Sequence, residues 1–189
     1  MVWKNLHIYV EKKSKSKFSQ YFLSIVAFIE SIFFPIPPDL ILIPIVYFNP
    51  NKFLVTALNC TIFSVIGGAF GYFIGYFIFD AVQSYFDMSK QTEFINFYND
   101  WGIFAVFLGG FTPIPYKIIA LTSGYSQFNF IYFIFLSMLS RALRFFIIAF
   151  IIKQFGDIGM QILKRNKLLI FVLIPIGIVF LIYLLFYHD

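Results

Sequence analysis

Long apolar stretches alternate with short polar segments along this chain. The apolar stretches are 18–34, 53–79, 103–125, 128–152 and 168–187. A helix rises about 1.5 Å per residue, so it needs about 20 residues to cross a hydrocarbon core about 30 Å thick. The stretches 53–79, 128–152 and 168–187 meet this length and are predicted to span a membrane, whereas 18–34 barely does.

Prolines interrupt two of the apolar regions in the same way. The later region reads Phe-Thr-Pro-Ile-Pro-Tyr-Lys over residues 111–117, and the earlier one reads Phe-Phe-Pro-Ile-Pro-Pro-Asp over residues 33–39. Proline lacks an N–H and blocks a straight helix. Pro35, Pro37, Pro113 and Pro115 therefore predict two hairpins that enter the membrane and return to the same side. Non-helical backbone at that depth must be buried in protein or line a watery cavity.

The two proline regions are 78 positions apart, and the same shift aligns residues 53–79 with residues 131–157. We interpret this as an internal repeat of one re-entrant hairpin and one spanning helix. Since the helix crosses the membrane once, the second copy is inverted relative to the first. Chance similarity between two proline-rich turns is the alternative.

The predicted fold is therefore an all-α integral membrane protein with a single domain, residues 1–189. It comprises a first repeat over about 18–79, a linker over 80–101, a second repeat over about 102–157 and an extra C-terminal transmembrane helix over 168–187. Aromatic residues alternate with acids and amides in the linker. We expect it to lie in the membrane interface, with Trp101 as an anchor.

The charges are segregated by segment. The chain is 60% hydrophobic and 12% charged, with a formal net charge of +5. Lysines and arginines concentrate in residues 1–17 and 153–167, whereas residues 80–100 are mostly acidic. The excess of positive charge on the cytoplasmic side places the N-terminus in the cytoplasm if 18–34 is only a hairpin arm. A fully crossing 18–34 would break this rule. Segregated charge of this kind is not a nucleic-acid signal.

Three glycines, Gly67, Gly71 and Gly75, recur at every fourth position of the stretch 53–79. This spacing puts small residues on one helix face, where another backbone can approach closely. Helix packing is the favoured interpretation, and direct contact with a substrate is the alternative.

Five charged residues lie at the predicted membrane depth: Glu30, Asp39, Lys117, Arg141 and Arg144. A charge at the centre of a bilayer costs roughly 2.5–3.5 kcal/mol on insertion scales. Apolar residues would fold the same bundle without this cost, so the charges favour a functional site over a purely structural salt-bridge cluster.

Arg141 and Arg144 are three residues apart on one helix face, with Ser137 one turn earlier. Two guanidinium groups and a hydroxyl can bind a phosphate with paired hydrogen bonds, and Lys117 adds a further positive charge. Glu30 and Asp39 are expected to hold the arginines when the site is empty or to exchange protons. The single cysteine, Cys60, and the two distant histidines fit neither a disulfide, nor a metal centre, nor a catalytic triad. We therefore expect no enzyme activity, no metal and no cofactor.

These residues resemble the DedA family of the VTT superfamily, in particular its YqaA-like branch. The resemblance is carried by residues 111–117, Ser123-Gly124 and the segment 140–146, with support from the acidic first hairpin and the glycines. It implies two facing re-entrant hairpins in a bacterial inner membrane. It also implies transport of polyprenyl phosphate or phospholipids that depends on the proton-motive force. The family's functional acids and arginines correspond to Glu30, Asp39, Arg141 and Arg144.

The leading hypothesis is a flippase or scramblase that moves an anionic lipid headgroup across the bilayer, with membrane lipids and protons as partners. Two alternatives stay open. The same buried charges suit a proton- or ion-coupled transporter of a small solute, and a membrane scaffold in envelope homeostasis would need no transport at all.

Overall fold

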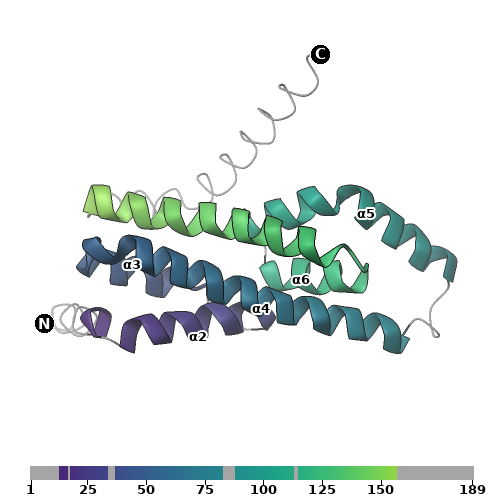
Figure 1. The fold of residues 1–189 in the computed structure, drawn as a ribbon, viewed down its shortest axis with the longest axis horizontal. Helices are drawn as coiled ribbons and strands as arrows, with labels where there is room; N and C mark the ends of the chain where they lie inside the picture. Colours follow the sequence, from purple (N-terminus) through teal and green to yellow (C-terminus); the bar gives the residue numbers. More distant parts are fainter. Residues whose placement is uncertain (1–12, 17, 34–36, 83–87, 113–114, 157–189) are drawn as a thin grey trace, which may run out of the picture.

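The computed structural model describes residues 13–16, 18–33, 37–82, 88–112 and 115–156, and these residues are almost entirely helical (Figure 1). Two helices are long and apolar enough to cross a membrane. One is α4, Phe53–Val82, which follows the short 3-10 helix η1, Pro50–Lys52. The other is the helix Phe130–Gly156, which runs antiparallel to α4. The expectation of an all-helical membrane protein is thus confirmed at this level, while the predicted helix 168–187 lies outside the described residues.

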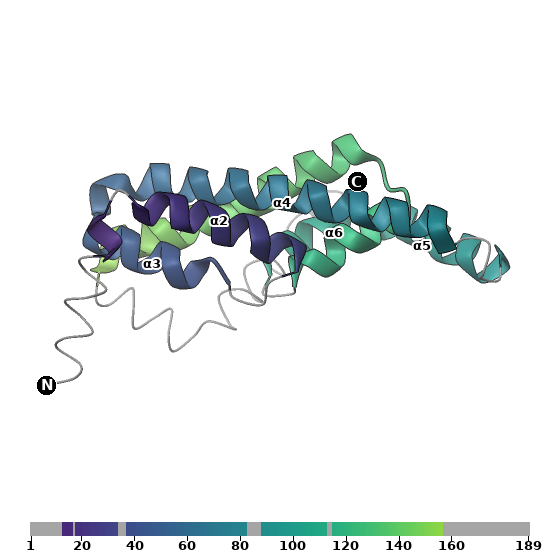
Figure 2. The same cartoon turned by 90° about the horizontal axis from the view of Figure 1, so that it is seen from below.

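Two pairs of shorter helices pack along the two long ones. The first pair is α2, Phe18–Ile32, and α3, Asp39–Phe48. The second pair is α5, Met88–Phe111, and α6, Tyr116–Tyr125. The pairs occupy opposite halves of the long helices (Figures 1 and 2). The end of α2 and the start of α6 are joined by a hydrogen bond from Lys117 to the carbonyl oxygen of Phe33. At about 1.5 Å per residue, the ten residues of α3 or α6 are too short to cross a bilayer.

Each helix pair has its own hydrophobic core. The first core cluster joins α2 and α3 to the start of α4 and the end of the helix Phe130–Gly156. The second joins α5 and α6 to the later part of α4 and the start of that same helix. Both long helices therefore contribute one half to each core, so the two helix pairs are held on a common frame.

The outer surface of the long helices is apolar. Val55 and Phe77 on α4 are 61% and 66% exposed, and Ile131 on the other long helix is 75% exposed. Apolar surface of this extent is rare on soluble monomers and is what hydrocarbon chains favour.

The boundary predicted between residues 101 and 102 does not coincide with a break in the structure. The helix α5 is continuous from Met88 to Phe111, so the end of the expected linker and the first arm of the second hairpin form one helix. Gly102 is accommodated inside this helix because it packs against the ring of Phe128, where a side chain would collide.

Candidate functional site

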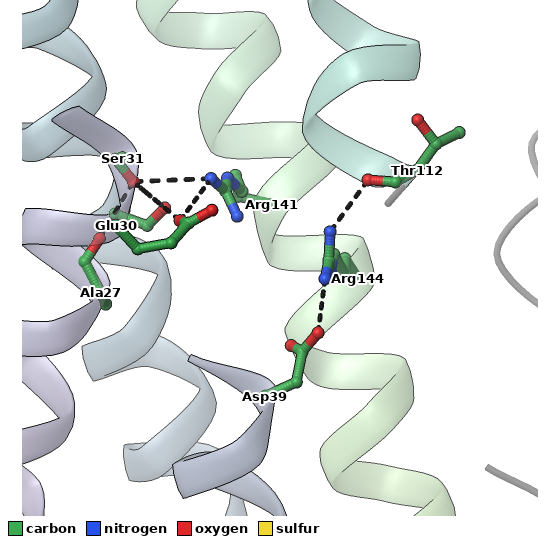
Figure 3. A network of polar contacts seen from close by, with 8 residues as sticks. Ala27, Glu30, Ser31, Asp39, Thr112, Arg141 and Arg144 are labelled. Atoms are coloured by element: carbon green, nitrogen blue, oxygen red, sulfur yellow. Dashed lines mark hydrogen bonds and ion pairs between the residues drawn. The ribbon is translucent and has the colours of Figure 1, made fainter. Parts of the chain in front are cut away.

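Arg141 and Arg144 lie near the midpoint of the helix Phe130–Gly156, facing Glu30 and Asp39 of the first hairpin and Thr112 of the second (Figure 3). They are only 1% and 7% exposed. Because the two residues are three positions apart, they share one helix face. Arginine does not lose its proton in proteins, so both positive charges must be balanced by neighbouring groups.

Arg144 connects the two hairpins. One end of its guanidinium group forms an ion pair with the buried carboxylate of Asp39, the first residue of α3. The other donates to the carbonyl oxygen of Thr112, directly after α5, at 2.9 Å. The C-terminal end of a helix carries partial negative charge, so this carbonyl suits a cation. Arg144 thus links the beginning of α3 to the end of α5.

Arg141 makes a parallel set of contacts. Its Nη2 atom lies 3.1 Å from Oε2 of Glu30 and 3.5 Å from the hydroxyl of Ser31, both near the end of α2. Its guanidinium group also lies 4.0 Å from the centre of the Tyr116 ring at the start of α6, a cation–π contact. Arg141 therefore also contacts both hairpins. The Ser31 hydroxyl in turn lies 2.8 Å from that of Ser64 on α4.

Lys117 was expected to add positive charge to the site of the two arginines, but its described hydrogen bond is to the backbone. Its amine donates to the carbonyl oxygen of Phe33, just beyond the end of α2, at 3.1 Å. This hydrogen bond again joins the second hairpin to the first. Lys117 is half-buried, and its observed partner is a backbone oxygen.

Ser137 is fully buried one turn before Arg141. Its hydroxyl interacts with the hydroxyl of Tyr116, although neither group makes a well-formed hydrogen bond within the described residues. A buried polar group without a good partner costs about 1–3 kcal/mol. Ser137 and Tyr116 are therefore weakly satisfied polar groups close to Arg141.

Two of the four hairpin prolines lie within the described residues, whereas Pro35 and Pro113 lie outside them. Pro115 immediately precedes α6 as its N-cap residue, and Pro37 lies two residues before α3. A proline at the start of a helix loses no hydrogen bond, because the first N–H groups have no partner inside the helix. Pro37 and Pro115 are therefore compatible with the helices that begin directly after them.

The three glycines of α4 face both hairpins at close range. A Cβ atom at position 67 would lie 2.3 Å from the carbonyl oxygen of Phe28 on α2, and one at position 75 would lie 2.0 Å from that of Leu121 on α6. At position 71 it would approach Ala120 at 3.1 Å. The glycines thus bring α4 against the backbones of the hairpins, and their described contacts are to protein.

Some members of this centre are not evident from the sequence. The carbonyls of Thr112 and Phe33 are backbone groups, which every residue has, so no sequence signal distinguishes them. Two side chains of the centre are sequence neighbours of residues that the sequence did indicate: Tyr116 precedes Lys117, and Ser31 follows Glu30. The contact of the Tyr116 ring with Arg141 is seen only in the structure.

Comparison with known protein families gives a match that covers most of the residues of this site. A model of the VTT domain matches residues 34–154, which include both arginines and the second hairpin. The chain belongs to the VTT domain family. This is the domain of the DedA family, so the resemblance inferred from the motifs is confirmed. Membership in this membrane-associated family, together with the two long apolar helices, identifies the chain as a membrane protein.

Similar proteins occur in bacteria and archaea. An uncharacterized protein of Haemophilus influenzae is 40% identical over 140 residues, covering 72% of this chain and 73% of the relative. One of Histophilus somni is 39% identical and covers 70% and 71% of the two chains. One of Methanocaldococcus jannaschii is 27% identical and covers 69% and 82%. No solved structure matches the chain significantly.

Proposed function

We propose that this VTT-domain protein transports a lipid with an anionic headgroup across the bilayer, as a flippase or scramblase and without enzymatic chemistry. The candidate lipids are phospholipids and polyprenyl phosphates. The observation that carries the proposal is the pair of buried arginines, Arg141 and Arg144, midway along a membrane-spanning helix. Each contacts both hairpins, so a ligand that binds the arginines acts on the contacts between the hairpins.

The architecture supports an inverted repeat around this centre. Each hairpin packs in a separate hydrophobic core, and the same two long helices complete both cores from opposite ends. In transporters built from inverted repeats, the substrate site lies near the bilayer midplane, between the repeats. The arginines occupy the corresponding place here, which is why we interpret the two helix pairs as re-entrant hairpins.

The paired charges suggest how a headgroup binds. In the observed state the two arginines are balanced by Glu30 and Asp39. An incoming phosphate can replace a carboxylate as the partner of a guanidinium group, because both groups accept two parallel hydrogen bonds from the planar fork. The displaced carboxylate then loses its positive partner. We propose that a proton takes this place, which would couple transport to proton movement.

The charge distribution supports one orientation. Lys52 directly precedes α4, and the Lys153 amine lies 3.9 Å from the centre of the Phe53 ring at the start of α4. Lys13 and Lys15 flank Ser14, whose carbonyl oxygen accepts a hydrogen bond from Asn49 near the same end of α4. The positive-inside rule places this end in the cytoplasm, and the resemblance to DedA proteins points to a bacterial inner membrane.

One observation favours a second candidate. Because each arginine already has a carboxylate partner, the same four charges would serve a membrane scaffold that only needs its hairpins joined. A buried ion pair holds segments in register whether or not a ligand ever enters.

Reconstitution into liposomes separates the two candidates. The purified protein is tested with labelled polyprenyl phosphate and labelled phospholipids in parallel. Arg141→Lys and Arg144→Lys each keep the charge but lose the planar fork. We expect each to slow transport about tenfold or more, the effect of losing one charge-assisted hydrogen bond of about 1.5–3 kcal/mol.

Lys153→Arg is the matched control, since it exchanges the same two residue types at an exposed site on the same helix. It should transport at the wild-type rate, and all three variants should remain folded in detergent. Wild-type transport by both arginine variants would contradict a phosphate-binding role and favour the scaffold.

A further inference from the structure

A groove runs along the outer surface between α2 and α4, away from the paired arginines. Its volume is about 530 Å³, within the range of about 300–1,000 Å³ typical of ligand pockets. It is open on one side, and most of its lining is apolar. The lining residues are Gln20, Tyr21, Ser24, Ile25, Val55, Leu58, Asn59, Ile62 and Phe63.

The floor of this groove is polar, unlike the surrounding surface. Gln20 donates from Nε2 to the hydroxyl of Thr56 at 2.8 Å. Asn59 donates from Nδ2 to the backbone oxygen of Gln20 at 3.1 Å and to its side-chain oxygen at 3.3 Å. Amide side chains are costly in hydrocarbon, even when they bond one another across a helix interface. Asn59 uses both of its amide N–H groups within this pair, so the second N–H of Gln20 Nε2 is the amide donor left for a ligand that enters from the side.

The rim of the groove is suited to a hydrocarbon chain. Tyr21 and Ile25 on α2 are 69% and 54% exposed, and Leu58 and Ile62 on α4 are 49% and 42% exposed. These residues recur at every fourth position on each helix, so each helix contributes one continuous apolar edge. Exposed aliphatic and aromatic groups beside a polar floor match a molecule with one apolar and one polar part.

One end of the groove carries positive charge. Lys52 is exposed one turn before Thr56, whose hydroxyl donates to the Lys52 carbonyl at 2.9 Å. This is the end of α4 that the charge distribution assigns to the cytoplasmic surface. A lysine at the membrane surface attracts anionic lipid headgroups, with an energy of about 1 kcal/mol.

Beyond the other end of the groove, the same two helices contact each other near the paired charges. Ser64 on α4 contacts the hydroxyl of Ser31 on α2, and Ser31 lies beside Arg141. Asn59 and Ser64 are five residues apart on α4, a rise of about 7.5 Å. The α2–α4 contact therefore leads from the groove to the residues beside Arg141.

We propose that this groove binds one phospholipid of the surrounding bilayer. The phosphate lies at Lys52 and the remaining N–H of the Gln20 amide, and an acyl chain lies along the apolar rim. The bilayer phospholipid is the occupant because this face is in contact with the bilayer and only an anionic headgroup complements Lys52. As the loading site for the arginine centre, the groove rests on the transport function proposed above.

Native mass spectrometry of the full chain in detergent, titrated with phosphatidylglycerol, tests the site. Leu58→Trp fills the groove, and Lys52→Gln removes the charge at its end. We expect wild type to retain one phosphatidylglycerol and Lys52→Gln to bind it about fivefold more weakly, the effect of about one lysine–headgroup attraction. Leu58→Trp should weaken binding at least as much, because the indole occupies the place of the acyl chain.

Two matched controls make the same substitutions outside the groove. Leu139→Trp changes a leucine that is 43% exposed on the other long helix, and Lys153→Gln removes an exposed lysine from the same end of the bundle. Both should bind phosphatidylglycerol as wild type does, and all variants are checked by circular dichroism and gel filtration. Lys52 is exposed, so its variant tests the site even if Leu58→Trp does not fold.

Equal weakening in controls and groove variants would overturn the proposal, as would unchanged binding in both groove variants. Displacement of phosphatidylglycerol by an equal amount of polyprenyl phosphate would overturn the choice of occupant. The liposome assay separates this site from the transport function. If the wild-type protein and Leu58→Trp transport lipid equally well, the groove is not a loading site, but the transport function stands. If the wild-type protein does not transport lipid, yet the groove variants bind phosphatidylglycerol more weakly, the transport function is refuted and the binding site stands.

Discussion

The contact between α4 and α6 gives a sharp test of the packing. Gly75 on α4 faces the backbone of Leu121, and Gly124 on α6 faces that of Tyr72. In Gly75→Ala the new Cβ atom would lie 2.0 Å from the Leu121 oxygen, where ordinary contacts begin at 3.4 Å. The two helices must therefore separate by about 1.4 Å, because the obstacle is backbone. Overpacking of this kind typically costs about 1–3 kcal/mol.

Gly71→Ala is the matched control for this change. It lies one turn away on the same helix, and its Cβ atom would meet Ala120 at 3.1 Å, which requires a shift of only a few tenths of an ångström. Both substitutions gain the same intrinsic helix preference, about 1 kcal/mol for alanine over glycine. The difference between them therefore measures the collision alone.

The free energy of unfolding in mixed micelles, followed by circular dichroism during a titration with SDS, gives this difference. Gly75→Ala should be less stable than Gly71→Ala by about 1–3 kcal/mol. In the double variant with Gly124→Ala, the second substitution should cost less than it does alone, since the first has already separated the same two helices. Equal stability of Gly75→Ala and Gly71→Ala would refute the close approach of α4 and α6.

Three further predictions concern the charges and the topology. Asp39→Asn leaves a buried guanidinium without its carboxylate, so it should destabilise the protein by about 3–5 kcal/mol in the same unfolding assay; a loss below about 1 kcal/mol would mean that the ion pair is dispensable. Glu30→Gln removes a carboxyl that we propose to exchange a proton and should change the pH profile of transport in liposomes, and an unaltered profile would assign Glu30 a structural role only. Lys13→Cys and Glu93→Cys, at exposed positions, should react with an impermeant thiol reagent from opposite sides of the membrane, while native Cys60 is buried and silent; reaction from one side would contradict the assigned topology.

The long helices and the turns are readable from the sequence because both depend on local rules. Apolar length predicted the span 53–79, and the structure has α4 over Phe53–Val82. The predicted span 128–152 corresponds to the helix Phe130–Gly156. The paired prolines predicted where the short helices α3 and α6 begin, since proline interrupts the helix that precedes it.

Which charges pair with each other depends on the tertiary structure and could not be predicted from local sequence. The sequence identified Glu30, Asp39, Arg141 and Arg144 as buried charges, but not which acid meets which arginine. That choice depends on how two hairpins, more than 70 residues apart in the chain, approach one helix. The role of Lys117 was equally hidden, because its partner is a backbone carbonyl defined only by the fold.

The different contacts on the two long helices have a mechanical consequence. The helix α4 meets both hairpins through glycines, backbone against backbone, where no water or ion can substitute for the lost contact. The opposite helix meets the hairpin turns through guanidinium groups, whose hydrogen bonds can pass to another anion. Separating α4 from the hairpins therefore loses van der Waals packing that no other group replaces. Separating the arginine helix breaks ion pairs that another anion can replace. The bundle thus combines one helix fixed by close packing with another whose ion pairs can exchange partners.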